Sequence, residues 1–190
     1  MSTYQLLRTL ARITHANINI KGGNYFQDEV YDAILATNKH QQVTQEAKLP
    51  LRKPTKIRKH HYVDILCVDE TIVTAINSKG KSFNNTKSED SELEEYQWYL
   101  SALQKQYPDK EVRYIIFKDE YHPADSKMKT YHYLNDNGIP VYNTEEYMIA
   151  NYNVDFDALE LRRQARAVAA CERVLREEGF NVEKLYETYC

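Results

Sequence analysis

Two runs of β-branched and aromatic residues, separated by a short acidic connection, constrain the fold of this chain more than any other feature. Residues 61–68 read HYVDILCV and residues 71–79 read TIVTAINSK, with Asp69 and Glu70 between them. Valine, isoleucine, threonine and tyrosine favour strands, and a two-residue polar connection favours a tight turn. The sequence therefore predicts an antiparallel β-hairpin whose loop is Asp69-Glu70.

The predicted hairpin gathers polar side chains on one face of a sheet. With the loop at Asp69-Glu70, Asp64 lies opposite Ala75 on the second strand. Cross-strand partners share a face, so Asp64 projects on the same side as Asn77 and Lys79. Asp64 and Asn77 are then diagonal neighbours, with Cα atoms roughly 7–8 Å apart. That separation allows both side chains to bind one metal ion, provided that position 77 supplies an oxygen ligand.

Helical and strand patterns alternate along the rest of the chain. Apolar residues at helical spacing predict helices, and dense apolar runs predict buried strands. The predicted helices cover residues 4–13, 25–36, 93–107, 125–136 and 155–178, and the predicted strands cover 112–118 and 139–142, with a strand fragment and a loop within 40–60. We therefore expect an α/β fold, in which helices flank a mixed central sheet. One domain over 1–190 would have its core at about 22–142 and a C-terminal helical extension at about 153–190.

Basic residues gather in one segment although the formal net charge of the chain is −3. The segment from Lys48 to Lys59 contains no acidic residue, and further lysines follow it. A solvated basic loop is one interpretation. A strip that binds nucleic-acid phosphates is the other, because clustered cations release counterions from that backbone. The predicted DNA-binding residues are Lys48, Arg52, Lys53, Lys56, Arg58, Lys59, Lys81 and Asn84.

Apolar patterning and cysteine usage exclude several classes of protein. The sequence has no uninterrupted apolar stretch of 18 residues and no signal-peptide pattern at its start, so a cytoplasmic protein without a membrane span is expected. The three cysteines are odd in number and widely spaced, which fits neither a disulfide framework nor a cysteine metal site.

The hairpin residues resemble the motif of the PD-(D/E)xK nuclease superfamily. In that family a strand aspartate, here Asp64, precedes an acidic-x-Lys triplet on the next strand, here Asn77-Ser78-Lys79. The α-β-β-β-α-β core order is also similar, although only two strands are predicted here before the long helix. Glu29 matches a first-helix glutamate that points toward the metal in several members. The resemblance covers about two-thirds of the chain and implies a restriction-endonuclease-like core.

The resemblance also implies a reaction and a set of metal ligands. Asp64, a carboxylate at position 77 and the Ser78 carbonyl would hold Mg²⁺, which lowers the pKa of a bound water. Lys79 would orient that water and stabilise negative charge, and Glu29 would add a ligand or hold a water just outside the metal's own ligands. The implied protein is a type II restriction enzyme that acts as a homodimer on double-stranded DNA. A Holliday junction resolvase, a repair nuclease and a non-catalytic DNA-binding relative are the alternatives.

Two positions depart from the family pattern. Val63 stands in place of the proline, which is a harmless variation, and Asn77 stands in place of the second carboxylate. An amide oxygen can bind a hard cation but brings no charge, so it predicts an inactivated or weakened site. An engineered substitution, a natural neutral ligand and a catalytically dead relative remain the three interpretations. A second acidic-x-Lys triplet, Glu46-Ala47-Lys48, lacks an upstream strand aspartate and is the weaker candidate.

Overall fold

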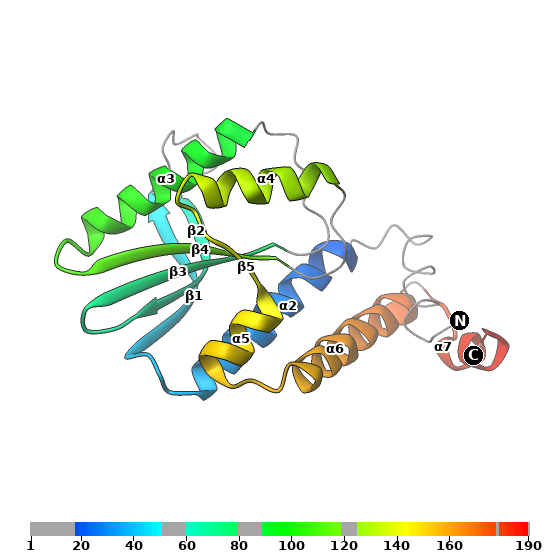
Figure 1. Ribbon diagram of the computed structural model, residues 1–190. Helices are drawn as coiled ribbons and strands as arrows, with labels where there is room; N and C mark the ends of the chain where they lie inside the picture. The colour runs from blue at the N-terminus through cyan, green and yellow to red at the C-terminus, as the bar shows by residue number, and fades with distance from the viewer. Residues whose placement is uncertain (1–17, 51–59, 80–88, 119–124, 178, 190) are drawn as a thin grey trace. The chain divides into compact units, whose positions relative to one another are not determined.

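The structure is a computed structural model that describes residues 18–50, 60–79, 89–118, 125–177 and 179–189 (Figure 1). The helix predicted over residues 4–13 and most of the predicted basic strip lie outside these ranges.

A mixed sheet forms the centre of the fold, as the sequence predicted, and within the described residues it has five strands. The strands are β1 (Gln42–Pro50), β2 (His60–Val68), β3 (Ile72–Lys79), β4 (Glu111–Lys118) and β5 (Val141–Asn143). They lie in the order β1-β2-β3-β4-β5. The β1–β2 and β2–β3 pairs are antiparallel, whereas the β3–β4 and β4–β5 pairs are parallel. The hairpin therefore continues into a parallel half that needs helical crossovers.

The helices that the structure describes are α2 (Ile18–Ala36), α3 (Glu89–Gln106), α4 (Asp125–Asp136), α5 (Thr144–Tyr152), α6 (Phe156–Glu177) and α7 (Val182–Tyr189). Helix α2 passes through Gly22-Gly23 instead of starting after it, because glycine inside a helix is unfavourable but tolerated. The sequence did not predict α5 or α7, and it left β1 as a fragment. With β1 as a full strand, the order α2-β1-β2-β3-α3-β4 is the α-β-β-β-α-β order of the resemblance.

One face of the sheet is covered by α3 and α4. Its hydrophobic core joins alternate residues of β3 and β4 to the sheet-facing side of α3, as Figure 1 shows for the two helices above the strands. From the strands it contains Leu66, Val68, Val73, Ala75, Tyr114 and Ile116, and from the helical side Leu93, Tyr96, Tyr99, Leu103 and Leu134. Residues two apart on a strand share a face, so Asn77 continues the row of Val73 and Ala75.

The opposite face is equally buried, which explains the dense apolar run of β4. Ile115 and Phe117 point away from α3 and are buried, and the Phe117 ring lies 5.0 Å from that of Tyr147 on α5. Cys67, on the same face of β2, is completely buried. A strand buried on both sides loses the alternation of polar and apolar residues.

The chain divides into two compact units, residues 31–154 and residues 1–30 with 155–190. The sheet and α3 to α5 belong to the first unit. In the second unit α7 folds back on α6, and Leu175 and Val182 form a small buried core between them. The turn uses Gly179 at φ +84°, a backbone conformation that favours glycine. The assignment of residues 1–190 to one domain stays a prediction.

Candidate functional site

The register of the β2–β3 hairpin differs from the predicted one by two residues. Val68 pairs with Val73 and Leu66 with Ala75, and the Asp69 N–H donates to the Ile72 carbonyl at 2.8 Å. The loop is therefore Glu70-Thr71, and the prediction of Asp69-Glu70 was wrong. A shift of two residues returns every side chain to the same face, so only the pairing partners change.

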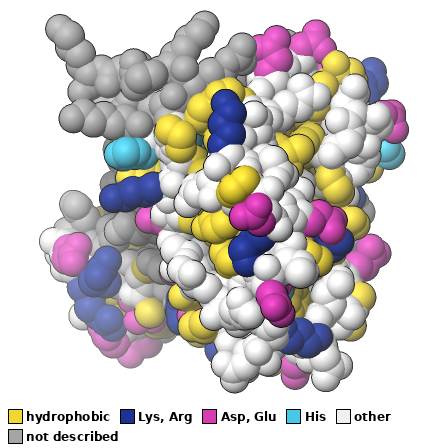
Figure 2. All heavy atoms as spheres, turned by 90° about the vertical axis from the view of Figure 1, so that its left-hand side faces the viewer, with side chains coloured by type: hydrophobic (Ala, Val, Ile, Leu, Met, Phe, Trp, Pro, Cys, Tyr) yellow, Lys and Arg dark blue, Asp and Glu magenta, His cyan; other side chains and the backbone are white. Residues whose placement is uncertain are grey.

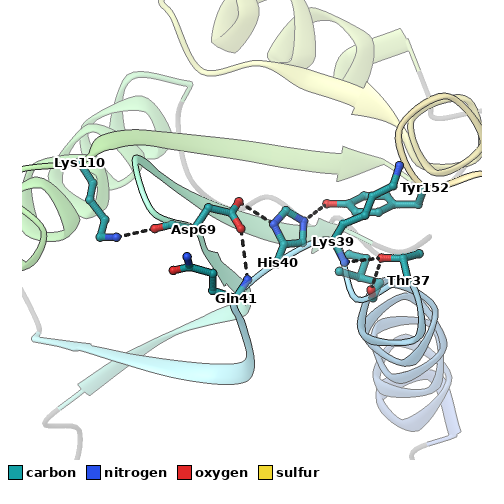
Figure 3. Close-up of polar contacts among 8 residues, drawn as sticks. Thr37, Lys39, His40, Gln41, Asp69, Lys110 and Tyr152 are labelled. Atoms are coloured by element: carbon teal, nitrogen blue, oxygen red, sulfur yellow. Dashed lines mark hydrogen bonds and ion pairs between the residues drawn. The ribbon is translucent and has the colours of Figure 1, made fainter.

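The reason for the shift is a polar network that fixes Asp69 outside the loop (Figure 3). The Asp69 carboxylate lies 2.7 Å from Nδ1 of His40 and accepts from the Gln41 N–H at 3.3 Å. The other ring nitrogen of His40 lies 2.9 Å from the Tyr152 hydroxyl. The Lys110 ammonium donates to the Asp69 carbonyl. This network joins the start of β1, the hairpin turn and the end of α5, so we assign it a structural role.

At the other end of the hairpin, the paired ladder stops just before Asp64 and Asn77. The pairs run from Val68–Val73 to Ile65–Ile76, so Asp64 and Asn77 are the next residues on the two strands. The Asp64 carboxylate also accepts a hydrogen bond of 2.7 Å from the Ser78 N–H. The Asp64 side chain thus accepts from a backbone N–H of β3 at the point where the two strands separate.

Asn77 is a buried polar side chain with an unused acceptor. It is 4% exposed, and its Oδ1 has no hydrogen-bond partner within the described part of the chain. Nearly all buried polar atoms in proteins have partners, and an unsatisfied one is destabilising. Because this oxygen lies on the face that carries Asp64, a cation or a hydrogen-bond donor bound there would satisfy it.

The backbone is irregular beside Asp64. Val63 and Leu66 belong to the same core although they are three residues apart. Residues on one face of a regular strand are an even number apart, so the alternation of side chains between the two faces of β2 is interrupted between them. On β1 the ladder skips Glu46 between the pairs Gln45–Ile65 and Ala47–Val63, and Glu46 has φ 51°, a left-handed conformation that is rare for glutamate. Glu46 and Lys48 of the second triplet are both exposed. Irregular strands of this kind are common near functional sites.

A second lysine, which the sequence analysis missed, lies beside Lys79. The parallel β3–β4 register pairs Lys79 with Lys118, so both residues lie where these two neighbouring strands end. The Lys118 ammonium lies 6.0 Å from the centre of the Tyr131 ring on α4, within range of a cation–π contact. Both strands end in lysine, and aligning those ends would have revealed the pair. The side chain of Lys79 lies outside what the structure describes.

Tyrosines of α3 and β4 pack against one another on the face of the sheet that α3 covers. The Tyr96 ring lies 5.5 Å from that of Tyr114, and the Tyr99 ring lies 5.9 Å from it. Burial raises the pKa of Tyr114 well above its usual value, and the neighbouring Tyr96 and the Asp64 carboxylate raise it further. The Tyr114 hydroxyl is also buried without a hydrogen-bond partner among the described residues. Two unsatisfied polar atoms therefore face the surroundings of Asp64.

Glu29 is engaged by two arginines within the second unit. Its side chain is 1% exposed, and Oε2 accepts from Nε of Arg162 at 2.8 Å. Oε1 has no hydrogen bond of good geometry, yet Nε of Arg166 lies 2.8 Å from it. We regard this carboxylate as paired, because charge attraction at that distance does not need a linear bond. Glu29 is therefore not a solvated surface glutamate, and its predicted metal role stays a prediction.

The predicted DNA-binding strip is mostly beyond the described ranges. Lys48 is exposed on β1, whereas the structure does not describe Arg52, Lys53, Lys56, Arg58, Lys59, Lys81 or Asn84. On the face shown in Figure 2, basic and acidic side chains are interspersed among apolar ones. Among the described side chains on that face, no strip of one sign is seen.

No family model matches this sequence, and no curated protein matches it. Three solved structures show distant likeness. The small subunit of the heterodimeric restriction endonuclease R.BspD6I has a TM-score of 0.45 and 15% identity, over 80% of this chain and 87% of that one. AF1548, a protein of unknown function, has a TM-score of 0.43 and 16% identity, over 86% and 93%. An XisH family protein from Nostoc punctiforme has a TM-score of 0.38 and 14% identity, over 64% and 93%.

Two features are absent from the described ranges. None of their helices is long and apolar enough to cross a membrane. Within the same ranges, no three His, Cys, Asp or Glu side chains converge in the manner of a metal site. A cation beside Asp64 would therefore need ligands of other kinds, such as an amide oxygen, as well as carboxylates.

Proposed function

We propose that this chain is a divalent-metal-dependent endonuclease that hydrolyses phosphodiester bonds in double-stranded DNA. The observation that carries the proposal is the buried Oδ1 of Asn77, which has no partner within the described residues, while the adjacent Ser78 N–H donates to the Asp64 carboxylate. A carboxylate and an unused amide oxygen on adjacent strands are hard oxygen ligands. The type II restriction enzyme of the resemblance is the specific form that we propose.

The residues present fit Mg²⁺, which commonly binds one or two carboxylates together with water and substrate phosphate. Asp64, Asn77 Oδ1 and the Ser78 carbonyl would hold the cation, which would polarise a phosphate and activate water. The Ser78 N–H fixes the Asp64 carboxylate through its 2.7 Å hydrogen bond. Lys79 and Lys118, paired in register where β3 and β4 end, would bind phosphate oxygens and stabilise negative charge that develops on them.

A plasmid cleavage assay with Mg²⁺ tests this function on three proteins: the unmodified chain, Asp64→Asn and Asn77→Asp. Because Asn77 contributes no charge, we expect Asn77→Asp to cleave faster than the unmodified chain, and Asp64→Asn to be inactive. Absence of cleavage by both the unmodified chain and Asn77→Asp, with DNA binding retained, would overturn the endonuclease proposal.

A non-catalytic DNA-binding protein is the second candidate, and the neutral side chain at position 77 is the observation that favours it. Such a protein would retain the fold and the basic residues without using the metal. Gel-shift titration in EDTA separates the two functions, because a binding module would hold DNA equally well with and without Mg²⁺. A junction resolvase or repair nuclease would instead prefer branched or damaged DNA to an intact plasmid.

We also propose that the chain acts on DNA as a homodimer. Two antiparallel DNA strands require two equivalent sites, and a two-fold protein matches a palindromic sequence. Light scattering of the purified chain, with and without a DNA duplex, measures the number of subunits directly. A monomer in both conditions would contradict cleavage by a symmetric dimer.

A further inference from the structure

The strands of the parallel half of the sheet end side by side. In register, Lys79 of β3 pairs with Lys118 of β4, and Lys118 pairs with Asn143 of β5. In open sheets with parallel strands, ligands bind outside the carboxyl ends of the strands. Lys118 stands in the middle of these strand ends, at the position where such a ligand is expected.

Lys118 also lies beside the candidate metal site. Tyr114, Ile116 and Lys118 alternate along β4, so they share the face of the sheet that α3 and α4 cover. Ile116 pairs with Asn77, which makes Lys118 and Asn77 diagonal neighbours with Cα atoms roughly 7–8 Å apart. The long, flexible stem of lysine reaches across much of this distance. A phosphate held by Lys118 would therefore lie next to the unused Oδ1 of Asn77.

The backbone of Lys118 is fixed, whereas its side chain has several rotatable bonds. Pairing with β3 and β5 holds the strand, and the Thr144 hydroxyl donates to the Lys118 carbonyl at 2.9 Å. A lysine side chain loses much rotamer entropy when it is ordered against a ligand. A contact that orders the side chain beforehand therefore strengthens binding.

The ring of Tyr131 on α4 supplies such a contact. The Lys118 ammonium lies 6.0 Å from the centre of this ring and makes no ion pair with a carboxylate among the described residues. Tyr131 is buried, and two residues further along α4 the Tyr133 hydroxyl donates to Asp90 of α3. A carboxylate would neutralise the ammonium, whereas a neutral ring attracts it and leaves its charge available to an anion.

The electrostatics of Tyr96 place the same ring near the candidate metal site. Burial is the largest cause that raises the pKa of Tyr96, and Asp64 and Tyr131 are among the ionisable neighbours that raise it further. The Asp64 carboxylate and the ring that contacts Lys118 therefore lie around one phenol group.

We propose that Lys118 and Tyr131 form a phosphate-binding pair, in which the lysine touches the DNA backbone and the tyrosine is a positioning residue. The inference rests on the proposed action on double-stranded DNA and specifies how one phosphate is held. Lys118 supplies the charge, and Tyr131 restricts where that charge lies. The ring of Tyr131 carries this role and the hydroxyl does not, so phenylalanine should replace it.

Proton NMR of selectively labelled lysine tests the contact without DNA. A CH₂ group over the face of an aromatic ring resonates upfield, so the ε-CH₂ protons of Lys118 should be shifted in the unmodified chain. Tyr131→Phe should keep the shift, Tyr131→Leu should abolish it, and Lys118→Arg identifies the resonance by its loss. Unshifted Lys118 resonances in the unmodified chain would overturn the inference, whether or not Tyr131→Leu folds.

Fluorescence titration of a DNA duplex in EDTA, at several salt concentrations, measures the function without cleavage. Lys118→Ala should make the dependence of log affinity on log salt less steep by about 0.9, the value for one phosphate contact. Tyr131→Leu should weaken binding by about threefold to tenfold, the range of a cation–π contact, and Tyr131→Phe should retain it. Lys105→Ala is the matched control, because Lys105 is exposed in the last turn of α3, near the start of β4. Its salt dependence should equal that of the unmodified chain.

The double variant Lys118→Ala with Tyr131→Leu separates positioning from a structural effect, and thermal melting verifies that each variant is folded. If the ring acts through the lysine, the double variant should bind DNA as Lys118→Ala does, within about twofold. A further loss of affinity would show that Tyr131 acts independently of Lys118 and would overturn the inference.

The same titration distinguishes this inference from the proposed function. If the unmodified chain binds the duplex and Lys118→Ala binds it with the same affinity and salt dependence, Lys118 touches no phosphate. The inference is then wrong while the DNA function stands. If the unmodified chain binds no duplex, the proposed function is wrong and the inference falls with it, even where NMR shows the contact.

Discussion

The substitution Asn77→Asp should destabilise the metal-free protein and make its stability depend on divalent cations. The Asp64 carboxylate accepts from the N–H of Ser78, the residue that follows position 77. A carboxylate at position 77 would therefore lie about 5 Å from it, the usual spacing of neighbouring side chains on adjacent strands. With an effective dielectric constant of about 20, two like charges at 5 Å repel by about 3 kcal/mol. The repulsion acts only in the folded protein, so the free energy of unfolding falls by that amount.

The expected loss of stability is large enough to measure by thermal denaturation. For a protein of this size, about 3 kcal/mol corresponds to a melting temperature roughly 6–12 °C lower. We expect this loss in EDTA at pH 8 and a recovery in millimolar Mg²⁺, since a bound cation replaces repulsion by attraction. At pH 5 the loss should be smaller, because repulsion raises the pKa of the carboxyl pair and a proton then neutralises one member.

Asn181→Asp provides the control, since it adds the same charge elsewhere. Asn181 is exposed and accepts from the Lys184 N–H at 2.8 Å, a role that aspartate also fills at a helix start. Its melting temperature should be unchanged by Mg²⁺. If Asn77→Asp melts in EDTA at the same temperature as the unmodified chain, the two side chains do not face each other and the register reasoning is refuted.

Three further substitutions or reactions test the surroundings of the site. Tyr114→Phe removes a buried hydroxyl without a partner in the described chain, so urea denaturation should show equal or higher stability, by up to about 1 kcal/mol. His40→Ala leaves Asp69 and Tyr152 without their hydrogen bonds to the ring and should lower the free energy of unfolding by about 1–3 kcal/mol. An unchanged denaturation midpoint would show that the network does not stabilise the fold. Burial raises the pKa of Cys67 to about 12, so mass spectrometry should find its thiol unmodified by iodoacetamide at pH 8 until the protein unfolds.

The sequence pattern was sufficient to predict the helices and strands in which polar and apolar residues repeat regularly. Helix α4 covers the predicted residues 125–136, and α6 lies within one residue of the predicted 155–178 at each end. The hairpin and the dense apolar run of β4 were also predicted. These elements are readable because a repeat of polar and apolar residues along the chain reflects one buried face.

The pairing of strands and the burial of side chains depended on contacts between segments that are far apart in the sequence. The hairpin loop shifted because His40 and Lys110, far from it in sequence, fix Asp69. Glu92 occurs in an acidic run that resembles a solvated helix start, and only the direction of α3 over the sheet buries it. Likewise, Lys118 becomes a neighbour of Lys79 only through the parallel register of two strands that a helix separates.

The sequence by itself determined that a hairpin carries Asp64 and position 77 on one face, because side-chain alternation along a strand is a local property. The tertiary structure alone decided that the Asp64 carboxylate accepts from the Ser78 N–H and that Asn77 has an unused oxygen among the described residues. Register and helix direction follow from the packing of the whole sheet unit, which no local pattern encodes.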